Sequence, residues 1–594
     1  RSYSVTGVQT CALPIYWYSG KLDNLPSPYQ ELFQGKWNDW LCAKYRDTAS
    51  LRQAWGGRTD PLGEEMIPDG TFARTPASAD TYPAWGLQHD GSSQGDWEIV
   101  PGEGGNVARL TIRKVGKTPN MPQFFRRFGV VEGTQYNLSF RLRVSKASSV
   151  SVRVSQDHDP WHVCGIRATL AATEQWQEHS YRFMATMTDA QVRLVFADFT
   201  EGVTVEIAGL SCRPGGTSGL EDSETLEAGT VPLPKPSGPS RLHLPPILAD
   251  MSDFLFACED AYFQTMVRTA KDEVGAVQPV TGTQLGYGFD YPQGRMDYCD
   301  IHSYWCHPSA PGDGSWTNPK LGQFWFVSNL PQVNRAPAPS TFAQLAIKRI
   351  VNRPYTVSEY DHPYPNFYAA EGNPMLFALG AFQNWGGILH FAWTHDDDYD
   401  PAVMTGYFDM KANPTKQIHY PACYAMFSRG DVRRGPGKYR YTLPLSEQQE
   451  RELSAAAAST NQYHQSTSLL KPDAALSFAV FAGTDLTDLN VRPKALASTT
   501  PIASWTDLPE TLGSPDRQWI RNEFGELYWS FAADQGGYFT VDTPGTKVFT
   551  GFVRGRSFAY QGLTLTPGKT RLDWTTISLV KANEIGRAAW RERV

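Results

Sequence analysis

The stretch from residue 353 to residue 366, RPYTVSEYDHPYPN, decides how this sequence is interpreted. Its apolar and β-branched run, residues 355–357, predicts a short buried strand that ends near Glu359. Aromatic residues, a histidine and prolines follow at once, and a solvated surface glutamate needs no such setting. The strands of an α/β barrel carry their chemistry at their carboxyl ends, so we take Glu359 as a candidate catalytic carboxylate.

Helices and strands alternate on both sides of this stretch. Helical periodicity recurs in residues 342–353 and 374–387, and strands are expected at 276–284, 296–305 and 388–395. Short connections between alternating strands and helices predict a parallel α/β fold. About four strands of this kind predict the C-terminal half of a (β/α)8 barrel within residues 241–434.

The ends of three consecutive expected strands carry side chains that suit glycoside hydrolysis: His302 and Tyr304, then Glu359, then Trp393. Neighbouring parallel strands end side by side, so Tyr304 should reach Glu359 by a hydrogen bond and Trp393 should flank the same cleft. A glutamate can attack an anomeric carbon, a phenol can hold the carboxylate, and an indole can stack on a pyranose. Further candidates for substrate contact are Gln284, Trp305, His362 and Asn366.

Each of these residues also has a structural interpretation. Glu359 could be an ion-paired glutamate, His302 a satisfied core histidine, and Trp393 a packing residue. A role in loop structure fits His362 and Asn366 as well as substrate contact does.

Three motifs carry a resemblance to a known superfamily: VTGTQLGYG (280–288), MDYCDIHSYWCHP (296–308) and the stretch 353–366. Over residues 17–65 and 241–430 the chain resembles the glycoside hydrolase clan A superfamily, nearest to the family 5-like, cellulase-type barrels. The resemblance implies a retaining hydrolase of a β-linked poly- or oligosaccharide. It implies that Glu359 is the nucleophile, that His302 and Tyr304 form the strand-six pair, and that Trp393 ends strand eight. It also implies no metal, no organic cofactor, a secreted or periplasmic location, and residues 17–66 as the barrel segment after strand four.

The same resemblance implies a second glutamate, the general acid, preceded by Asn at the end of strand four. That strand should precede the helix predicted from Ser27, at the start of the chain. Two Asn-Glu pairs exist, Asn522-Glu523 and Asn583-Glu584, and we interpret both as coincidental. Residues 5–15 and 584–594 resemble translated sequencing adapters, so residues 1–16 and 584–594 are expected to be artefacts. The acid/base glutamate is therefore expected upstream, and this fragment is expected to be inactive.

Period-two alternation replaces the helical pattern in residues 67–213 and predicts an inserted jelly-roll sandwich. IPDGTFA (67–73), Trp85 and TEQWQEHSYRF (173–183) resemble carbohydrate-binding modules of the family 4/9 type. Trp97 and Trp161 are its candidate stacking residues, and core packing fits either equally well. Residues 214–240 are rich in Gly, Pro, Ser and acids and predict a linker, and residues 435–583 predict a terminal β-sandwich.

Composition excludes several classes of protein. A net charge of −7 in 594 residues leaves no basic footprint for nucleic acid, and no apolar run is long enough to predict a membrane span. The eight cysteines lack paired ligand spacing, and the acidic residues 396–400 lack the spacing of a calcium loop.

Together, the strand and helix patterns predict the fold class α/β plus all-β, with a polysaccharide or oligosaccharide as the expected partner. The competing hypothesis is a non-catalytic carbohydrate-binding or structural protein on a degenerate barrel.

Overall fold

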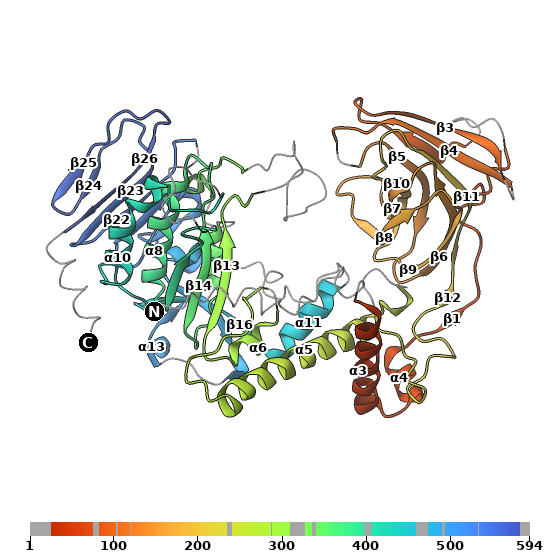
Figure 1. The fold of residues 1–594 in the computed structure, drawn as a ribbon, viewed down its shortest axis with the longest axis horizontal. Helices are drawn as coiled ribbons and strands as arrows, with labels where there is room; N and C mark the ends of the chain where they lie inside the picture. Colours follow the sequence, from red (N-terminus) through yellow and green to blue (C-terminus); the bar gives the residue numbers. More distant parts are fainter. Residues whose placement is uncertain are drawn as a thin grey trace. The chain divides into compact units, whose positions relative to one another are not determined.

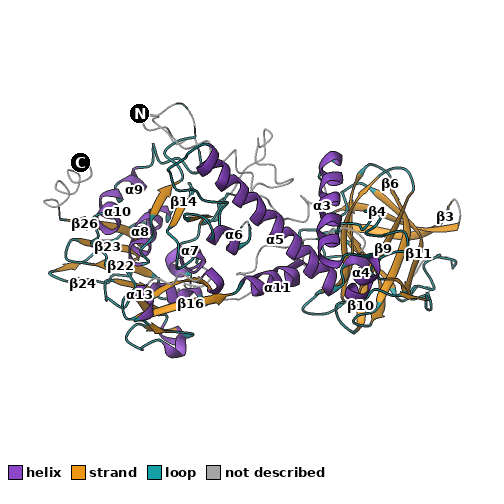
Figure 2. Cartoon of the chain, turned by 90° about the horizontal axis from the view of Figure 1, so that it is seen from below, coloured by secondary structure: helices purple, strands orange, loops and turns teal. Residues whose placement is uncertain are grey.

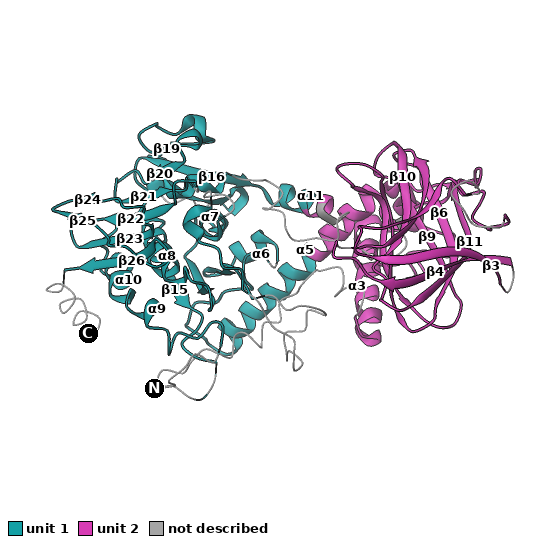
Figure 3. Ribbon diagram, turned by 90° about the horizontal axis from the view of Figure 1, so that it is seen from above, with its two compact units in different colours: residues 1–16, 256–453, 464–594 teal, residues 17–255, 454–463 magenta. Residues whose placement is uncertain are grey.

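The computed structural model describes most of the chain and divides it into two compact units (Figure 3). Unit 1 comprises residues 1–16, 256–453 and 464–594, and unit 2 comprises residues 17–255 and 454–463. The described residues are 25–74, 82–102, 105–118, 120–234, 240–286, 288–308, 327–335, 340–395, 397, 406–458, 473–489, 494–532 and 534–581. The two segments predicted to be adapter artefacts, 1–16 and 584–594, lie outside them.

Unit 2 contains the predicted sandwich, built from two five-stranded antiparallel sheets (Figure 1). One sheet has the order β2-β5-β10-β7-β8 and the other the order β3-β4-β11-β6-β9. The strands are β2 (Trp85–Gln88), β3 (Gln94–Gly102), β4 (Gly105–Lys114), β5 (Gln123–Val130), β6 (Gln135–Val144), β7 (Ser148–Gln156), β8 (Val163–Ala172), β9 (Gln177–Met184), β10 (Asp189–Ala197) and β11 (Thr204–Pro214). A small antiparallel pair, β1 (Thr59–Asp60) with β12 (Gly216–Thr217), joins the two ends of this segment.

The alternation of apolar and polar residues gives each sheet one apolar face, and the two apolar faces pack together. In β6, Leu138, Phe140 and Leu142 are buried, while the residues between them point away from the core. The inward faces of both sheets form one continuous cluster of buried apolar side chains. The period-two prediction over residues 67–213 therefore gives the correct architecture for this part of the chain.

Two helices of unit 2, α3 (Ser27–Tyr45) and α4 (Thr48–Trp55), pack against the first turns of α5 (Pro245–Arg268). The rings of Trp37 and Phe254 lie 5.2 Å apart, and the indole N–H of Trp55 donates to Asp250 at 2.7 Å. Ser27 begins α3 as predicted, although Pro26 is the residue before it and no side chain caps it.

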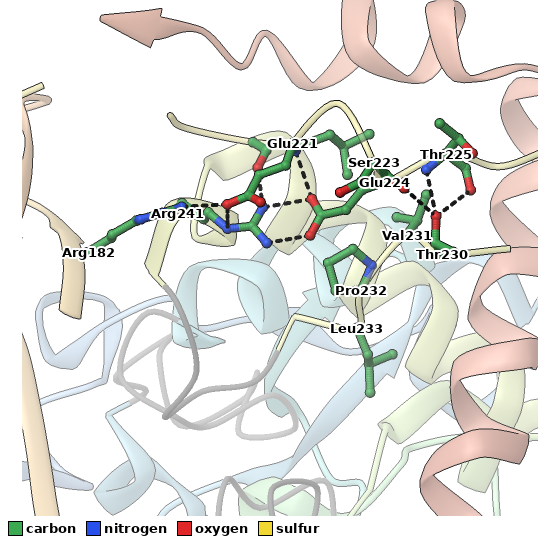
Figure 4. Close-up of polar contacts among 12 residues, drawn as sticks. Arg182, Glu221, Ser223, Glu224, Thr225, Thr230, Val231, Pro232, Leu233 and Arg241 are labelled. Atoms are coloured by element: carbon green, nitrogen blue, oxygen red, sulfur yellow. Dashed lines mark hydrogen bonds and ion pairs between the residues drawn. The ribbon is translucent and has the colours of Figure 1, made fainter. Parts of the chain in front are cut away.

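The segment predicted as a linker is held in place over its described part, residues 214–234. Asn38 of α3 exchanges two hydrogen bonds with the backbone of Val231, and the Trp37 indole donates to the carbonyl of Pro232. Arg241 is buried and donates to both carboxylate oxygens of Glu224, and Glu221 pairs with Arg182 of β9 (Figure 4). These contacts fix the described part of the segment to α3 and β9, which its composition does not reveal.

Unit 1 mixes helices with short strands, whereas unit 2 is mostly strand (Figure 2). Its first sheet is parallel, in the order β13 (Cys299–Tyr304), β14 (Tyr355–Asp361) and β15 (Gly387–His390). The intervening helices are α7 (Thr341–Lys348) and α8 (Gly372–Phe382), and α6 (Asp290–Gly294) precedes β13. Gln284 makes one isolated parallel bridge to Asp300, where a further strand was predicted.

These strands confirm a parallel α/β arrangement but do not form a closed barrel within the described residues. A second parallel sheet of unit 1 has the order β17 (Phe481–Leu486), β16 (Tyr439–Leu445) and β18 (Thr500–Pro501). It touches the first sheet's region through an isolated bridge from Ile350 to Thr484. The half-barrel within residues 241–434 stays a hypothesis.

The prediction of a β-sandwich over residues 435–583 is wrong for residues 435–501. That part holds the second parallel sheet together with α11 (Glu447–Ala458) and α13 (Lys494–Ala497), after α9 (Pro414–Gln417) and α10 (Tyr420–Phe427). A six-stranded antiparallel sheet follows, with the strands β19 (Gly513–Ser514), β20 (Trp519–Arg521), β21 (Leu527–Ser530), β22 (Tyr538–Asp542), β23 (Thr546–Phe552) and β26 (Trp574–Val580). The hairpin β24 (Phe558–Tyr560) and β25 (Leu563–Leu565) packs on β23 through Phe549 and Phe558.

Candidate functional site

A β-bulge at the end of β14 positions Glu359. Ile301 pairs with Val357, but the next residue of β13, His302, pairs with Glu359, so Ser358 is an extra residue in β14. A bulge turns two successive side chains toward the same neighbour, and bulges are common beside functional sites. Here both Ser358 and Glu359 reach His302, which strict alternation along a strand would forbid.

One oxygen of the Glu359 carboxylate lies against two side chains, Tyr304 and His302. The Tyr304 hydroxyl donates to Oε2, and His302 Nδ1 lies 3.2 Å from the same oxygen. Glu359 is 8% exposed. Among the described residues no hydrogen bond or ion pair reaches its other oxygen, Oε1, and that oxygen is not among the fully buried unpaired atoms. The carboxylate is therefore fixed through one oxygen and open at the other.

Asp300 fixes the position of Ser358, a residue that contacts His302. It accepts hydrogen bonds from the hydroxyls of Thr356 and Ser358 and from the Ser358 backbone N–H. Nε2 of His302 lies 2.7 Å from Ser358 Oγ and 3.4 Å from Asp300 Oδ2. The imidazole is thus anchored at both ring nitrogens, so it can orient Glu359 without swinging away.

The other predicted residues surround this cluster in different ways. Trp393 lies in the loop after β15 and is 48% exposed. The Trp305 indole donates to the carbonyl of Leu330 at 2.9 Å, which ties it to a loop. Gln284 is half-buried, and Thr283 donates to its side-chain oxygen.

Two predicted substrate contacts, His362 and Asn366, are buried and do not contact Glu359 through any hydrogen bond of the described residues. His362 is 1% exposed, with Nε2 3.0 Å from both the Tyr360 hydroxyl and Gln332 Oε1. Burial, together with the positive charges of Lys416 and His390, lowers the pKa of His362 well below its usual value. The Asn366 carbonyl oxygen accepts the Tyr368 backbone N–H, as a turn-forming asparagine does. These contacts fit the loop-structure alternative, and substrate contact by either residue stays a prediction.

Sequence reasoning missed a buried charge cluster beside Glu359. Asp361 and Lys416 form an ion pair with both side chains 1% exposed, and His390 Nε2 lies 3.0 Å from the same carboxylate. Burial lowers the pKa of Lys416, and Asp361 opposes that effect. Lys416 lies 55 residues further along the chain, so no local pattern marks it. The "YDHP" run was the available signal, because a buried strand does not carry an aspartate at its end without a partner.

No second carboxyl group is placed at Glu359 by the contacts of the described residues. Asp300 is bound to Ser358 and Thr356. Glu523 accepts backbone N–H groups of Gly437, Lys438 and Tyr439, as expected for a coincidental Asn-Glu pair, and Glu584 lies outside the described residues. No group of three or more potential metal ligands occurs in the described ranges.

A pocket of about 820 Å³ opens elsewhere in unit 1, between the loop after β14, α9 and β26. Asn366 lines it together with Tyr364, Phe367 and Trp574, whereas Glu359 does not. This pocket and the Glu359 cluster are therefore separate features of unit 1.

The two candidate tryptophans of the sandwich differ in their surroundings. Trp97 packs into the core, with its ring 5.2 Å from Phe124 and 6.3 Å from Tyr82. Trp161 is 51% exposed, on the turn between β7 and β8, and the guanidinium of Arg193 lies 5.2 Å from its ring centre. Of the two, Trp161 is the one that a ligand can reach.

No protein-family model matches the chain, and no curated protein matches it either. Solved structures resemble about a quarter of the chain. One described as "CBM4 structure and function" is 23% identical, with 25% of this chain and 99% of that chain covered and a TM-score of 0.23. The N-terminal cellulose-binding domain of β-1,4-glucanase C from Cellulomonas fimi is 18% identical, with 26% and 95% covered and a TM-score of 0.16. These scores are too low to carry an argument about function.

The chain contains no helix in its described residues that is long and apolar enough to cross a membrane. The seven cysteines that the structure describes are free.

Proposed function

We propose that this protein binds carbohydrate, with the sandwich of unit 2 as the binding module. The observation that carries the proposal is the exposure of Trp161, which lies on the turn between β7 and β8 and contacts Arg193. A flat, half-exposed indole offers a stacking surface for a pyranose at little entropic cost. The core already contains its own aromatic residues, such as Trp97, so packing does not account for Trp161.

Affinity electrophoresis of the full chain through gels containing soluble glucans, xylans, mannans, galactans or acidic polysaccharides tests this proposal. We expect at least one polymer to retard the chain, and Trp161→Ala to abolish the retardation. Tyr262→Ala, which removes an exposed aromatic ring of α5, is the matched control and should bind normally. If no polymer in the panel retards the wild-type chain, the proposal is wrong.

A second candidate function, retaining glycoside hydrolysis on a partial barrel, is favoured by the open oxygen of Glu359. A nucleophilic carboxylate must be oriented and must still present one oxygen to the anomeric carbon. Tyr304 and His302 both contact Oε2, which leaves Oε1 for that attack. A retaining enzyme also needs an acid/base carboxyl about 5–5.5 Å away. An enzyme that acts on polymeric glycan meets its substrate outside the cytoplasm, so a secreted or periplasmic location belongs to this proposal.

Covalent labelling separates the two functions without requiring the acid/base group. In a 2-deoxy-2-fluoroglycosyl fluoride, the carboxylate attacks the anomeric carbon while fluoride leaves as the anion, so no general acid is needed. We expect peptide mass spectrometry to find an ester at Glu359 after incubation with the gluco, manno, galacto or xylo probe, and none in Glu359→Gln. If the chain binds carbohydrate but no probe labels Glu359, the binding function stands and the proposed hydrolase activity is wrong.

A further inference from the structure

The outward face of the sheet β2-β5-β10-β7-β8 gathers four arginines. Strand register places Arg127 of β5 opposite Arg193 of β10, and Arg153 of β7 opposite Arg167 of β8. Val195 lies next to Arg153 across the β10–β7 pair and opposite Phe125 across the β10–β5 pair. We call Phe125, Arg127, Arg153, Arg167 and Arg193 the arginine face. Several of their neighbours along the strands, among them Phe124, Val152 and Leu194, belong to the apolar core between the sheets.

The arginine face carries more positive charges than it has acidic side chains to neutralise them. Asp157 lies 3.3 Å from Arg193 and also pairs with Arg127. Asp198 is the acid that interacts with Arg153. Burial, aided by neighbouring arginines, lowers the pKa of both Arg153 and Arg193. Four like charges gathered on one face of a chain whose net charge is −7 need an explanation other than general surface charge.

Aromatic rings lie among these charges. Phe125 packs over Gly86 of β2, where an added Cβ would come within 2.7 Å of the ring. The guanidinium groups of Arg127 and Arg193 lie 4.7 and 5.4 Å from the centre of the Phe125 ring. Trp161 stands above Arg193 at the rim of the face. The face therefore combines a stacking ring with guanidinium groups that are already held in place.

Buried polar atoms on the same face have no partner in the described structure. Arg193 is 6% exposed, and its Nε–H finds no acceptor although one of its terminal nitrogens donates to Gln88 at 2.7 Å. The side-chain oxygens of Gln123 and Ser151, 4% and 9% exposed, are also unpaired. Unsatisfied buried polar groups are costly, so these atoms need partners such as ordered water, an ion or a polar ligand.

We propose that the arginine face binds an acidic polysaccharide, with a sugar ring stacked on Trp161 and its carboxylate or sulfate groups held by Arg153, Arg167 and Arg193. This inference rests on the proposed carbohydrate binding and names its substrate class. Guanidinium groups recognise carboxylate and sulfate oxygens through the same paired N–H geometry. Neutral glucans or xylans offer no group that would need four arginines.

Isothermal titration of the full chain tests the inference with four probes: polygalacturonate, a sulfated galactan, a neutral galactan and poly-L-glutamate. We expect one of the two acidic polysaccharides to bind at least about tenfold more tightly than the neutral galactan, since a charge-assisted contact is worth about a factor of ten or more. Which acidic polymer binds more tightly distinguishes carboxylate from sulfate recognition. Poly-L-glutamate should bind weakly, because it offers charge without a sugar ring.

The double variant Arg153→Gln/Arg167→Gln should weaken acidic polysaccharide binding by about tenfold to a hundredfold. Arg141→Gln, on the opposite sheet, is the matched control and should bind as the wild type does. Equal binding of acidic and neutral polymers, equal binding of poly-L-glutamate, or unchanged binding by the double variant would each overturn the inference. Trp161-dependent binding of a neutral polymer alone would overturn it while leaving the proposed carbohydrate binding intact.

Discussion

The sandwich of unit 2 and the α/β part of unit 1 place their charged residues in opposite ways. The sandwich has an apolar interior and carries four arginines on one outward face, where Nε of Arg193 lacks a partner among the described residues. The α/β part buries the ion pair of Asp361 and Lys416, whose side chains are each 1% exposed. Outward charges are available to a ligand, whereas buried charges are committed to one another. Charged residues therefore indicate a ligand-binding surface in the sandwich and a structural role in the α/β part.

Of the changes considered for the two regions, replacement of Lys416 should cause the largest loss of stability. Replacing Lys416 by Met leaves the buried Asp361 carboxylate with His390 as its remaining partner. Loss of one member of a buried ion pair costs about 3–5 kcal/mol. We expect unit 1 to lose that much stability, measured by hydrogen exchange on peptides that span residues 355–390. The double variant Asp361→Asn/Lys416→Met should recover part of the loss, and a neutral effect of Lys416→Met would contradict the buried pair.

The two sandwich tryptophans give the next largest contrast. Trp97→Ala opens a cavity beside Phe124 and should cost the sandwich about 3 kcal/mol. Trp161→Ala removes only an exposed ring and its contact with Arg193, and should cost less than about 1 kcal/mol. Urea unfolding followed by exchange in peptides from residues 135–172 measures both. Similar losses for the two variants would mean that Trp161 is a packing residue as well.

Loss of the Tyr304 hydroxyl, which donates to Glu359, should slow the reaction of Glu359 and leave the free energy of unfolding almost unchanged. Tyr304→Phe deletes a hydrogen bond to a carboxylate, worth about 1.5–3 kcal/mol, and keeps the ring that packs on Phe408. We expect labelling of Glu359 by a fluoroglycosyl fluoride to slow by at least about tenfold with little change in unfolding. Unchanged labelling of Tyr304→Phe would show that Tyr304 does not orient the carboxylate.

Glu371 should make unit 1 less stable as the pH rises from about 6.5 to 8. Burial raises the pKa of Glu371 from 4.5 to about 8, so the folded chain keeps a proton that the unfolded chain has lost. His362, whose pKa is lowered from 6.5, acts in the opposite sense below pH 6.5 and partly cancels the effect there. The expected slope is at most about 1.4 kcal/mol per pH unit.

Glu371→Gln should remove this slope, because an amide does not titrate. Exchange of the residue 369–382 peptides at pH 6.5, 7.25 and 8 measures it in both proteins. Equal slopes in the variant and the wild type would assign the pH dependence to other buried groups.

The sequence predicted those parts of the fold that depend on local periodicity. Strands β6, β7, β10 and β11 follow the alternating runs, and β13, β14 and β15 follow the strand ends marked by His302, Glu359 and Trp393. The contact between Tyr304 and Glu359 was also predicted, because adjacent parallel strands end together. Whether these residues act on a substrate stays a prediction.

Features that depend on distant residues could not be predicted. The bulge at Ser358 leaves no periodic signature, yet it is what brings His302 to Glu359. His362 looked like a substrate contact because its buried partner Gln332 lies 30 residues away. The 214–234 segment looked like a linker because its anchors, Gln34 and Asn38, belong to a helix almost 200 residues earlier.

The central claim is that the sandwich binds carbohydrate on the arginine face. Hydrogen exchange of the full chain, with and without a saturating acidic polysaccharide, tests it most directly. We expect slower exchange in peptides from residues 123–130, 148–172 and 189–197, which carry this face, and no change in peptides from residues 94–114. No protection anywhere in the sandwich, or protection confined to the opposite sheet, would contradict the account.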